Sequence, residues 1–295
     1  MIKVQVPATT ANLGPGFDCM GLALSLYGRF SFQTIEEGLK FEGVPLQFQN
    51  EDNLAIRSYR LAEKAASKSP AKGGLRLSID SDIPVSRGLG SSASLIVAGI
   101  LAANAACGYA LSEHQILNLA TVIEGHPDNV APALLGGLTV SMMDNNQAFA
   151  IRCPISKSIR FCALIPDFEL STHLARSVLP KSVPFADALF NASHAACLLP
   201  ALEKGDIGLI RKALKDSLHQ KYRAELIDQY GLIQDMMKEE VMFISGAGPT
   251  LMCIYQQEDF PERIARELAD LNHQWKAVPL KTAIHGPSVT EVDDE

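Results

Sequence analysis

The segment Pro84–Ser94 places glycines and serines between a predicted strand and a predicted helix. Its sequence is PVSRGLGSSAS, with a short alternating strand at 75–79 before it and an apolar helix after it that Gly108 can end. Glycines let the backbone approach a ligand closely, and the first turn of a helix offers N–H groups without intrahelical partners beside the positive end of the helix dipole. This segment therefore predicts an anion-binding site.

Better-known phosphate loops fit the segment less well. A Walker A loop, G-x-x-x-x-G-K-[ST], needs a lysine that does not occur here. The dinucleotide-binding pattern G-x-G-x-x-[GA] is matched by Gly88, Gly90 and Ala93, but it requires a second parallel strand that ends in an acidic residue about 20 positions later. The sequence continues instead as helix, glycine, helix. A plain loop whose serine caps the helix stays open as an alternative.

A second group of polar residues follows the next predicted helix. That helix, over 112–124, begins with an S-x-x-Q capping box and carries an apolar stripe. It leaves Glu124 in the last turn, where the helix dipole disfavours a negative charge by about 0.3–1 kcal/mol. A functional reason for Glu124 is therefore favoured over a solvated helix end. Gly125 and Pro127 stop the helix and frame His126, which we expect in a cleft.

Length and composition set the frame for these residues. The chain has 295 residues, 47% of them hydrophobic and 20% charged, which is typical of a globular protein and long enough for two domains that share a cleft. A formal charge of −7 without a dense basic run excludes nucleic acid as the expected partner. The longest apolar run, Leu95–Cys107, has 13 residues against about 20 for a membrane span, and no secretory signal is evident, so we expect a cytoplasmic protein.

Helical and strand patterns fill both halves of the chain, with a domain boundary expected near residue 153. Strands are expected at 2–6 and 161–165, a helix from Asn53 as N-cap, and a Gly-rich hairpin over 241–255. Further helices are expected at 185–203, 206–219 and 260–272, and a disordered acidic tail at 291–295.

Three motifs in order resemble one family. PVSRGLGSSAS is similar to the phosphate-binding motif of the GHMP kinases, the superfamily of galactokinase and of homoserine, mevalonate and phosphomevalonate kinases. VPATTANLGPGFDCMGLAL near the N-terminus and ISGAGPTLMCIY near the C-terminus resemble the other two family motifs. Within the superfamily, ANLGPGFD together with EGHPDNVAPALLGG resembles the homoserine kinases. The likeness runs from residue 3 to about residue 255.

This resemblance implies a fold and an activity. The fold would be the α+β, two-domain GHMP kinase fold, with a ribosomal protein S5 domain 2-like domain over 1–153 and a ferredoxin-like domain over 154–295. ATP would lie in the cleft between them. The activity would be ATP- and Mg²⁺-dependent phosphorylation of the side-chain hydroxyl of L-homoserine to O-phospho-L-homoserine, a step toward threonine. Family members are commonly dimers, so a homodimer is expected.

The resemblance also assigns site residues. ATP would contact Asn53 and the loop residues Pro84, Val85, Ser86, Arg87, Gly88, Leu89, Gly90, Ser91, Ser92, Ala93 and Ser94, and Mg²⁺ would bind Ser91 and Glu124. The ammonium and hydroxyl end of the amino acid would face Asn12 and Asp18, and its carboxylate would face His126, Arg176 and Arg223, with Thr172 a further contact. Asn53 and Ser91 could instead be helix N-caps, and each arginine could be a surface residue.

The proton acceptor is left open by the sequence. Asp128 stands where related kinases place a carboxylate that takes the hydroxyl proton, whereas homoserine kinases are thought to pass that proton to the γ-phosphate. Asn129 would orient the reacting groups, with Arg176 beside them. Asp-Asn after Pro127 could also be ordinary turn chemistry.

Other functions fit the sequence less well. Another small-alcohol kinase of the superfamily is the nearest alternative. Mevalonate kinase fits less well, because the lysine that certain relatives use near the start of the first motif is not evident here. A noncatalytic protein of the same fold would have no use for a charge-complementary amino-acid pocket built from Asp18, Glu124, His126 and the two arginines.

Glu124 and His126 are separated by Gly125 alone, where some relatives insert several residues, so the metal site could be more exposed.

Overall fold

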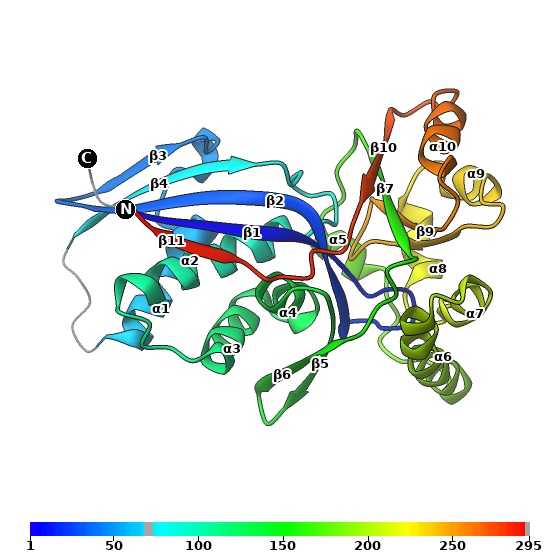
Figure 1. Cartoon of the computed structure of the whole chain (residues 1–295), viewed down its shortest axis with the longest axis horizontal. Helices are drawn as coiled ribbons and strands as arrows, with labels where there is room; N and C mark the ends of the chain where they lie inside the picture. The colour runs from blue at the N-terminus through cyan, green and yellow to red at the C-terminus, as the bar shows by residue number, and fades with distance from the viewer. Residues whose placement is uncertain (68–72, 293–295) are drawn as a thin grey trace.

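The computed structural model describes residues 1–67 and 73–292, and these form two β-sheets with helices packed against them (Figure 1). The first sheet has 7 strands; β11, β1, β2, β4 and β3 lie in that order, β5 pairs with β2, and β6 with β5. The bounds are β1 Ile2–Ala11, β2 Met20–Ile35, β3 Leu39–Glu42, β4 Gly74–Ser81, β5 Leu138–Asp144, β6 Gln147–Cys153 and β11 Ser288–Glu291. The β3–β4 pair is parallel and the others are antiparallel.

Helices of the first half gather on one side of this sheet (Figure 1). They are α1 (Leu54–Ala66), α2 (Ser91–Ala106), α3 (Glu113–Glu124) and α4 (Pro127–Leu135). Helix α2 is apolar on all sides and is buried over most of its length, because α1, α3 and α4 surround it and the sheet covers the rest. Gly99 permits the contact with α1, since a Cβ at this position would lie 2.3 Å from the carbonyl oxygen of Ala55. The start of α2, and with it the glycine-rich loop, is therefore held rigidly.

The second sheet has 4 strands in the order β10, β7, β9, β8. Their bounds are β7 Arg160–Pro166, β8 Val241–Ile244, β9 Leu251–Tyr255 and β10 Trp275–Leu280. Side chains of β9 alternate: Met252 and Ile254 join the core formed with α6 (Phe185–Lys204) and α7 (Ile207–Ala213), and Leu251 and Cys253 join the core formed with α9 (Tyr230–Asp235) and α10 (Phe260–Leu268). Short segments complete the fold: α5 Thr172–Ser177, α8 Gln220–Arg223, and the 3₁₀ turns η1 Leu46–Phe48 and η2 Ala224–Leu226. Helices thus cover both faces of this sheet.

Most predicted elements are present. The strand, loop and helix expected across 75–108 are β4, the glycine-rich loop and α2; the expected capping box begins α3, and the Gly-rich hairpin is the antiparallel β8–β9 pair. The helix expected over 112–124 ends at Glu124 as predicted, with Gly125 in the left-handed conformation as its C-cap, and Pro127 then starts a further helix, α4, where its missing N–H and fixed φ suit the first position. The helix expected over 206–219 ends at Ala213.

The C-terminal strand crosses between the two halves. β6 ends at Cys153 and β7 opens the second sheet at Arg160, yet β11 returns to pair with β1 of the first sheet (Figure 1). The division at 153/154 therefore stays a prediction about domains, and sheet membership does not follow it throughout. Of the acidic tail, Glu291 ends β11, and residues 293–295 lie outside the described residues.

Among the described helices, none combines the length and the apolar character needed to cross a bilayer. All six cysteines are free thiols.

Candidate active site

A cavity of about 600 Å³ brings most of the predicted site residues together. Its walls include the predicted residues Asn12, Asp18, Asn53, Pro84, Val85, Ser86, Arg87, Gly88, Gly90, Ser91, Ser92, Ser94, Glu124, His126, Asp128, Asn129, Thr172, Arg176 and Arg223. Two residues of the predicted nucleotide loop are not part of the wall: Leu89 and Ala93 point into the two hydrophobic cores. Residues 246–248 of the β8–β9 turn, which the sequence motif ISGAGPTLMCIY contains, complete the wall.

The glycine-rich loop has the backbone of an anion cradle. Gly88 and Gly90 have φ values of +74° and +73°, which only glycine adopts without strain. Close packing adds a second reason, because a Cβ on Gly88 would lie 2.3 Å from the carbonyl oxygen of Ser245. Ser94 makes the first intrahelical bond of α2, from its N–H to Gly90 O, so the N–H groups of the preceding three residues lack helical acceptors. These N–H groups at the start of a long helix can bind an anion.

Arg87 ties this loop to the second sheet. Its guanidinium donates to the carbonyl oxygens of Pro166 at 3.1 Å and Asp167 at 3.0 Å and lies 3.3 Å from the carboxylate of Glu169. Although Arg87 borders the cavity, its charge is already engaged. The arrangement indicates an anchor for the loop, and the predicted contact of Arg87 with ATP stays a prediction.

Ser92 and Glu124 form a direct pair on the cavity wall. The Ser92 hydroxyl donates to the Glu124 carboxylate at 2.6 Å, across the gap between the start of α2 and the end of α3. Burial raises the pKa of Glu124 above its usual range, and the Ser92 hydrogen bond opposes that rise. The predicted partner of Glu124 was Ser91; neighbouring residues of a helix point about 100° apart, and it is Ser92 that points to Glu124.

Polar groups at the start of α4 hold one another in place. Asp128 is almost fully buried and its carboxylate lies 2.5 Å from Nδ1 of His126. Burial lowers the pKa of His126, but the hydrogen bond and charge of Asp128 outweigh it and raise that pKa above its ordinary value. The side-chain oxygen of Asn129 accepts a hydrogen bond from the Thr9 hydroxyl at 2.7 Å. Both side chains suggested for proton transfer and orientation are thus already hydrogen-bonded.

An ion pair forms another part of the cavity wall. Asp18 and Arg176 form a two-point pair, with N···O distances of 3.1 and 2.7 Å. A backbone hydrogen bond fixes Asp18 in place: its N–H donates to the side-chain oxygen of Asn12 at 3.0 Å. The side-chain amide of Asn12 in turn donates to Gly246 O at 2.8 Å. Thr172 begins α5, the helix that carries Arg176. The predicted amino-acid site is therefore assembled from both halves of the chain.

Arg223 is almost completely buried beside this pair. Its Nε donates to Ala175 O at 3.1 Å and its Nη1 to Gly246 O at 2.9 Å. Burial lowers the pKa of Arg223 to about 10, which leaves it a cation at neutral pH. The Phe17 ring lies 5.1 Å from the Arg223 guanidinium and 5.7 Å from that of Arg176. Sequence reasoning gave Phe17 no role, although it stands inside the ANLGPGFD motif.

Asn53 is the N-cap of α1 and also borders the cavity. Its side-chain oxygen accepts from the N–H groups of Ala55 and Ile56, and its amide donates to Phe48 O at 3.0 Å. The N-cap role that the sequence allowed is therefore present, and contact with adenine stays a prediction.

Comparison with known proteins identifies the family. Family models for the GHMP kinases N terminal domain and the GHMP kinases C terminal domain match residues 53–137 and 198–274. A homoserine kinase from Clostridium botulinum is 47% identical over 286 residues, which are 95% of this chain and 96% of the relative.

Solved structures agree in fold. The crystal structure of homoserine kinase from Cytophaga hutchinsonii has a TM-score of 0.84 at 24% identity and covers 98% of this chain and 97% of its own. A putative homoserine kinase from Listeria monocytogenes has a TM-score of 0.79 at 30% identity, covering 99% of this chain and 100% of its own. The predicted two-domain α+β fold is confirmed, and the chain belongs to the GHMP kinases and, within them, to the homoserine kinase family.

Proposed function

We propose that this protein transfers the γ-phosphoryl group of ATP to the side-chain hydroxyl of L-homoserine, giving O-phospho-L-homoserine and ADP, a step toward threonine. One observation carries the proposal: a single cavity has free helix N–H groups at one wall and the opposed charges of Asp18, Arg176 and Arg223 at another. The first suits a chain of phosphates, and the second suits a free amino acid.

The amino acid would exchange partners with the Asp18–Arg176 pair. A zwitterion brings an ammonium for Asp18 and a carboxylate for Arg176, so both side chains keep an opposite charge when the ligand enters between them. A ligand with only one of these charges would leave one side chain uncompensated. Arg223, and His126 held by Asp128, would add donors for the carboxylate. This exchange favours an amino acid over mevalonate or a sugar.

The metal site would be the Ser92–Glu124 pair. A hydroxyl and a carboxylate 2.6 Å apart are hard oxygen donors, and their proximity fits a Mg²⁺ ion that takes its remaining ligands from phosphates and water. Bound there, Mg²⁺ would supply positive charge to the β- and γ-phosphates. The predicted ligand Ser91 also borders the cavity, but the contact with Glu124 leads us to propose Ser92.

Proton transfer would need no dedicated base. Asp128 is committed to His126, and Asn129 to Thr9. As the homoserine oxygen forms its bond to the γ-phosphorus and the bond from phosphorus to the β-phosphate oxygen breaks, the hydroxyl proton would pass to an oxygen of the transferred group. The chain would then act by positioning and by charge, with N–H donors of the loop and Arg176 near the reacting groups.

A panel of alcohols tests the function. We expect ADP release in a coupled assay to be stimulated by L-homoserine and not by mevalonate, galactose or shikimate. Stimulation by one of the other alcohols would replace the substrate, and no stimulation by any would remove the kinase proposal. The matched variant Arg223→Ala should raise KM for homoserine far more than KM for ATP.

The expected homodimer and cytoplasmic location rest on the family resemblance and on composition. Light scattering of the purified protein and fractionation of its source cells test them.

A further inference from the structure

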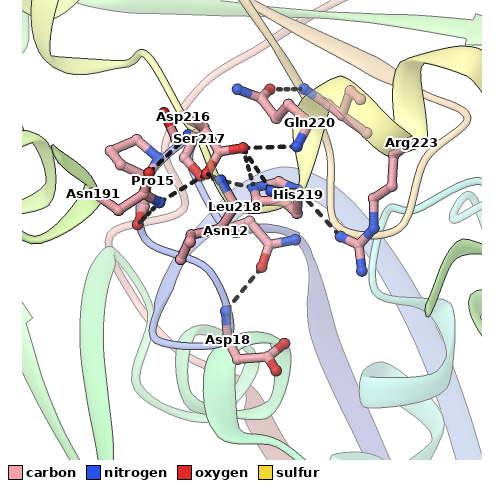
Figure 2. A network of polar contacts seen from close by, with 12 residues as sticks. Asn12, Pro15, Asp18, Asn191, Asp216, Ser217, Leu218, His219, Gln220 and Arg223 are labelled. Atoms are coloured by element: carbon pink, nitrogen blue, oxygen red, sulfur yellow. Dashed lines mark hydrogen bonds and ion pairs between the residues drawn. The ribbon is translucent and has the colours of Figure 1, made fainter. Parts of the chain in front are cut away.

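A buried polar network connects the loop that carries Asp18 to the helix that carries Arg223 (Figure 2). At its centre is His219, whose side chain is fully buried. Its Nε2 lies 2.8 Å from Gly14 O, and its Nδ1 lies 3.4 Å from Nη1 of Arg223. Sequence reasoning assigned no role to His219.

The two hydrogen-bond partners of His219 determine which ring nitrogen carries the proton. The Gly14 carbonyl can only accept, so Nε2 must carry hydrogen; the Arg223 guanidinium can only donate, so Nδ1 must be bare. His219 is therefore a neutral donor and acceptor at once, and burial, which lowers its pKa, favours that form. Its ring also stacks on Phe17, with centroids 5.0 Å apart. One imidazole thus contacts both the Asp18 loop and Arg223.

Asp216 and Asn191 fix the backbone around His219. The buried carboxylate of Asp216 accepts from the backbone N–H groups of Leu218, His219 and Gln220 at 2.7–3.1 Å, which fixes the turn into α8. Asn191 donates to Asp216 at 2.8 Å and to Pro15 O at 3.2 Å. These contacts explain why α7 does not extend through 214–219, since Asp216 takes the N–H groups of the turn.

The network closes into a ring. Asn12 and Arg223 both donate to Gly246 O, so hydrogen bonds lead from Asn12 through Gly246 and Arg223 to His219 and back to the loop at Gly14. The loop is pressed against this support: a Cβ on Gly14 would lie 2.3 Å from the carbonyl oxygen of Leu214.

The ring leaves one part of Arg223 available. Nε and Nη1 are engaged by Ala175, Gly246 and His219, whereas Nη2 has no hydrogen-bond partner among residues 1–67 and 73–292. Arg223 borders the cavity, so Nη2 is the amino group left for a ligand there. The direction of this donor depends on the contacts that hold the other two nitrogens.

We propose that His219, held by Asp216 and Asn191, is a positioning residue that sets the Arg223 guanidinium relative to the Asp18 loop and so fixes the spacing between the carboxylate and ammonium sites of the substrate. The inference rests on the proposed function, because the ligand it concerns is L-homoserine. It adds residues outside the predicted site.

Calorimetric titration of three His219 variants tests it. His219→Phe keeps the ring that stacks on Phe17 and removes both nitrogens; His219→Asn can keep an acceptor near the Nδ1 position for Arg223; His219→Gln can keep a donor near the Nε2 position for Gly14. We expect His219→Phe to weaken L-homoserine binding about 10- to 100-fold, with Kd for a nonhydrolysable ATP analogue changed less than about twofold. His219→Asn should recover part of the homoserine affinity, and His219→Gln less. KM for homoserine should be highest in His219→Phe, lower in His219→Gln and lowest of the three in His219→Asn.

A control is available on α6. His194 also stacks on a phenylalanine, Phe190, with centroids 3.7 Å apart, and it is not among the described residues that border the cavity. His194→Phe should bind homoserine as the wild type does.

Several results would overturn the inference. Wild-type homoserine affinity in both His219→Phe and His219→Asn would remove the positioning role. An equal loss of homoserine and ATP-analogue binding would indicate a general scaffold. If His219→Phe does not fold, the other two variants decide. Wild-type homoserine affinity in both His219→Asn and His219→Gln would then refute the positioning role. Failure of the wild-type protein to bind homoserine would instead refute the proposed function.

Discussion

Replacing Asp18 by Asn separates the stabilising role of the Asp18–Arg176 pair from its proposed role in binding. The side chains of Arg176 and Asp18 are 38% and 34% exposed, so solvent screens their attraction. Such a pair contributes at most about 1 kcal/mol to the free energy of unfolding, which corresponds to a fall in Tm of no more than about 4 °C. Asn also tolerates the φ of +58° at this position, and the hydrogen bond from the backbone N–H to Asn12 is unaffected by the change.

Binding should respond much more strongly than stability. The substrate ammonium would lose a charged acceptor, and a hydrogen bond between charged groups contributes about 1.5–3 kcal/mol, so kcat/KM for homoserine should fall about 10- to 150-fold. KM for ATP should stay near the wild-type value, because the partners of Asp18 are Arg176 and Asn12, and neither belongs to the glycine-rich loop. A coupled ADP assay with either substrate varied, together with thermal unfolding, measures each quantity.

The chain offers a matched control. Arg160 and Glu258 form a 3.0 Å ion pair whose side chains are 45% and 86% exposed, and neither borders the cavity. Glu258→Gln should change neither Tm beyond a few degrees nor homoserine kinetics. Unchanged homoserine kinetics in Asp18→Asn would refute the assignment of the ammonium site, and a parallel collapse of Tm would show that the pair is structural.

Three further changes probe the rest of the site. Gly88→Ala should raise KM for ATP and lower Tm, because the new Cβ would meet the Ser245 carbonyl, whereas Gly108→Ala, with φ +68° and open space around it, should show only the backbone strain of about 1–2 kcal/mol in thermal unfolding. Ser92→Ala should raise the Mg²⁺ concentration needed for half-maximal activity more than Ser91→Ala does; equal effects would contradict the Ser92–Glu124 metal site. Asp128→Asn should lower kcat by less than the roughly 10²- to 10⁴-fold contribution of a general base, and a loss near 10⁴-fold in single-turnover kinetics would restore Asp128 as that base.

Local sequence patterns predicted the parts of the site that depend on local structure. Gly88 and Gly90 stand where a strand gives way to a helix, and their spacing alone indicated an anion cradle. The choice between Ser91 and Ser92 could not be made in this way, because it depends on how α2 is rotated against α3 by packing over its whole length. For the same reason, local sequence could not show that the Arg87 guanidinium is engaged by Pro166 and Asp167, which lie in the other half of the chain.

Long-range contacts also explain why His219 was missed. Its partner Gly14 is 205 positions away, and neither its type nor its spacing marks it as part of a site. Within 206–219 the helical pattern continues past Ala213, and only the buried carboxylate of Asp216 shows why the backbone departs from it. The end of α3 before Pro127 was predicted, but the new helix α4 that begins at Pro127 was not, although this residue type is suited to a helix start.

The turn after β8 connects the two halves of the cavity. The Ser245 hydroxyl donates to Gly88 O at 2.6 Å and so contacts the glycine-rich loop, while the next residue, Gly246, accepts from both Asn12 and Arg223. A displacement of this turn would therefore shift the phosphate cradle and the amino-acid site together. Phosphoryl transfer depends on the distance between the donor phosphate and the acceptor hydroxyl. Because this turn contacts both sites, that distance depends on the position of the turn. The ISGAGPTLMCIY motif, which contains this turn, thus has a physical function even where it contributes no side chain to the binding of a ligand.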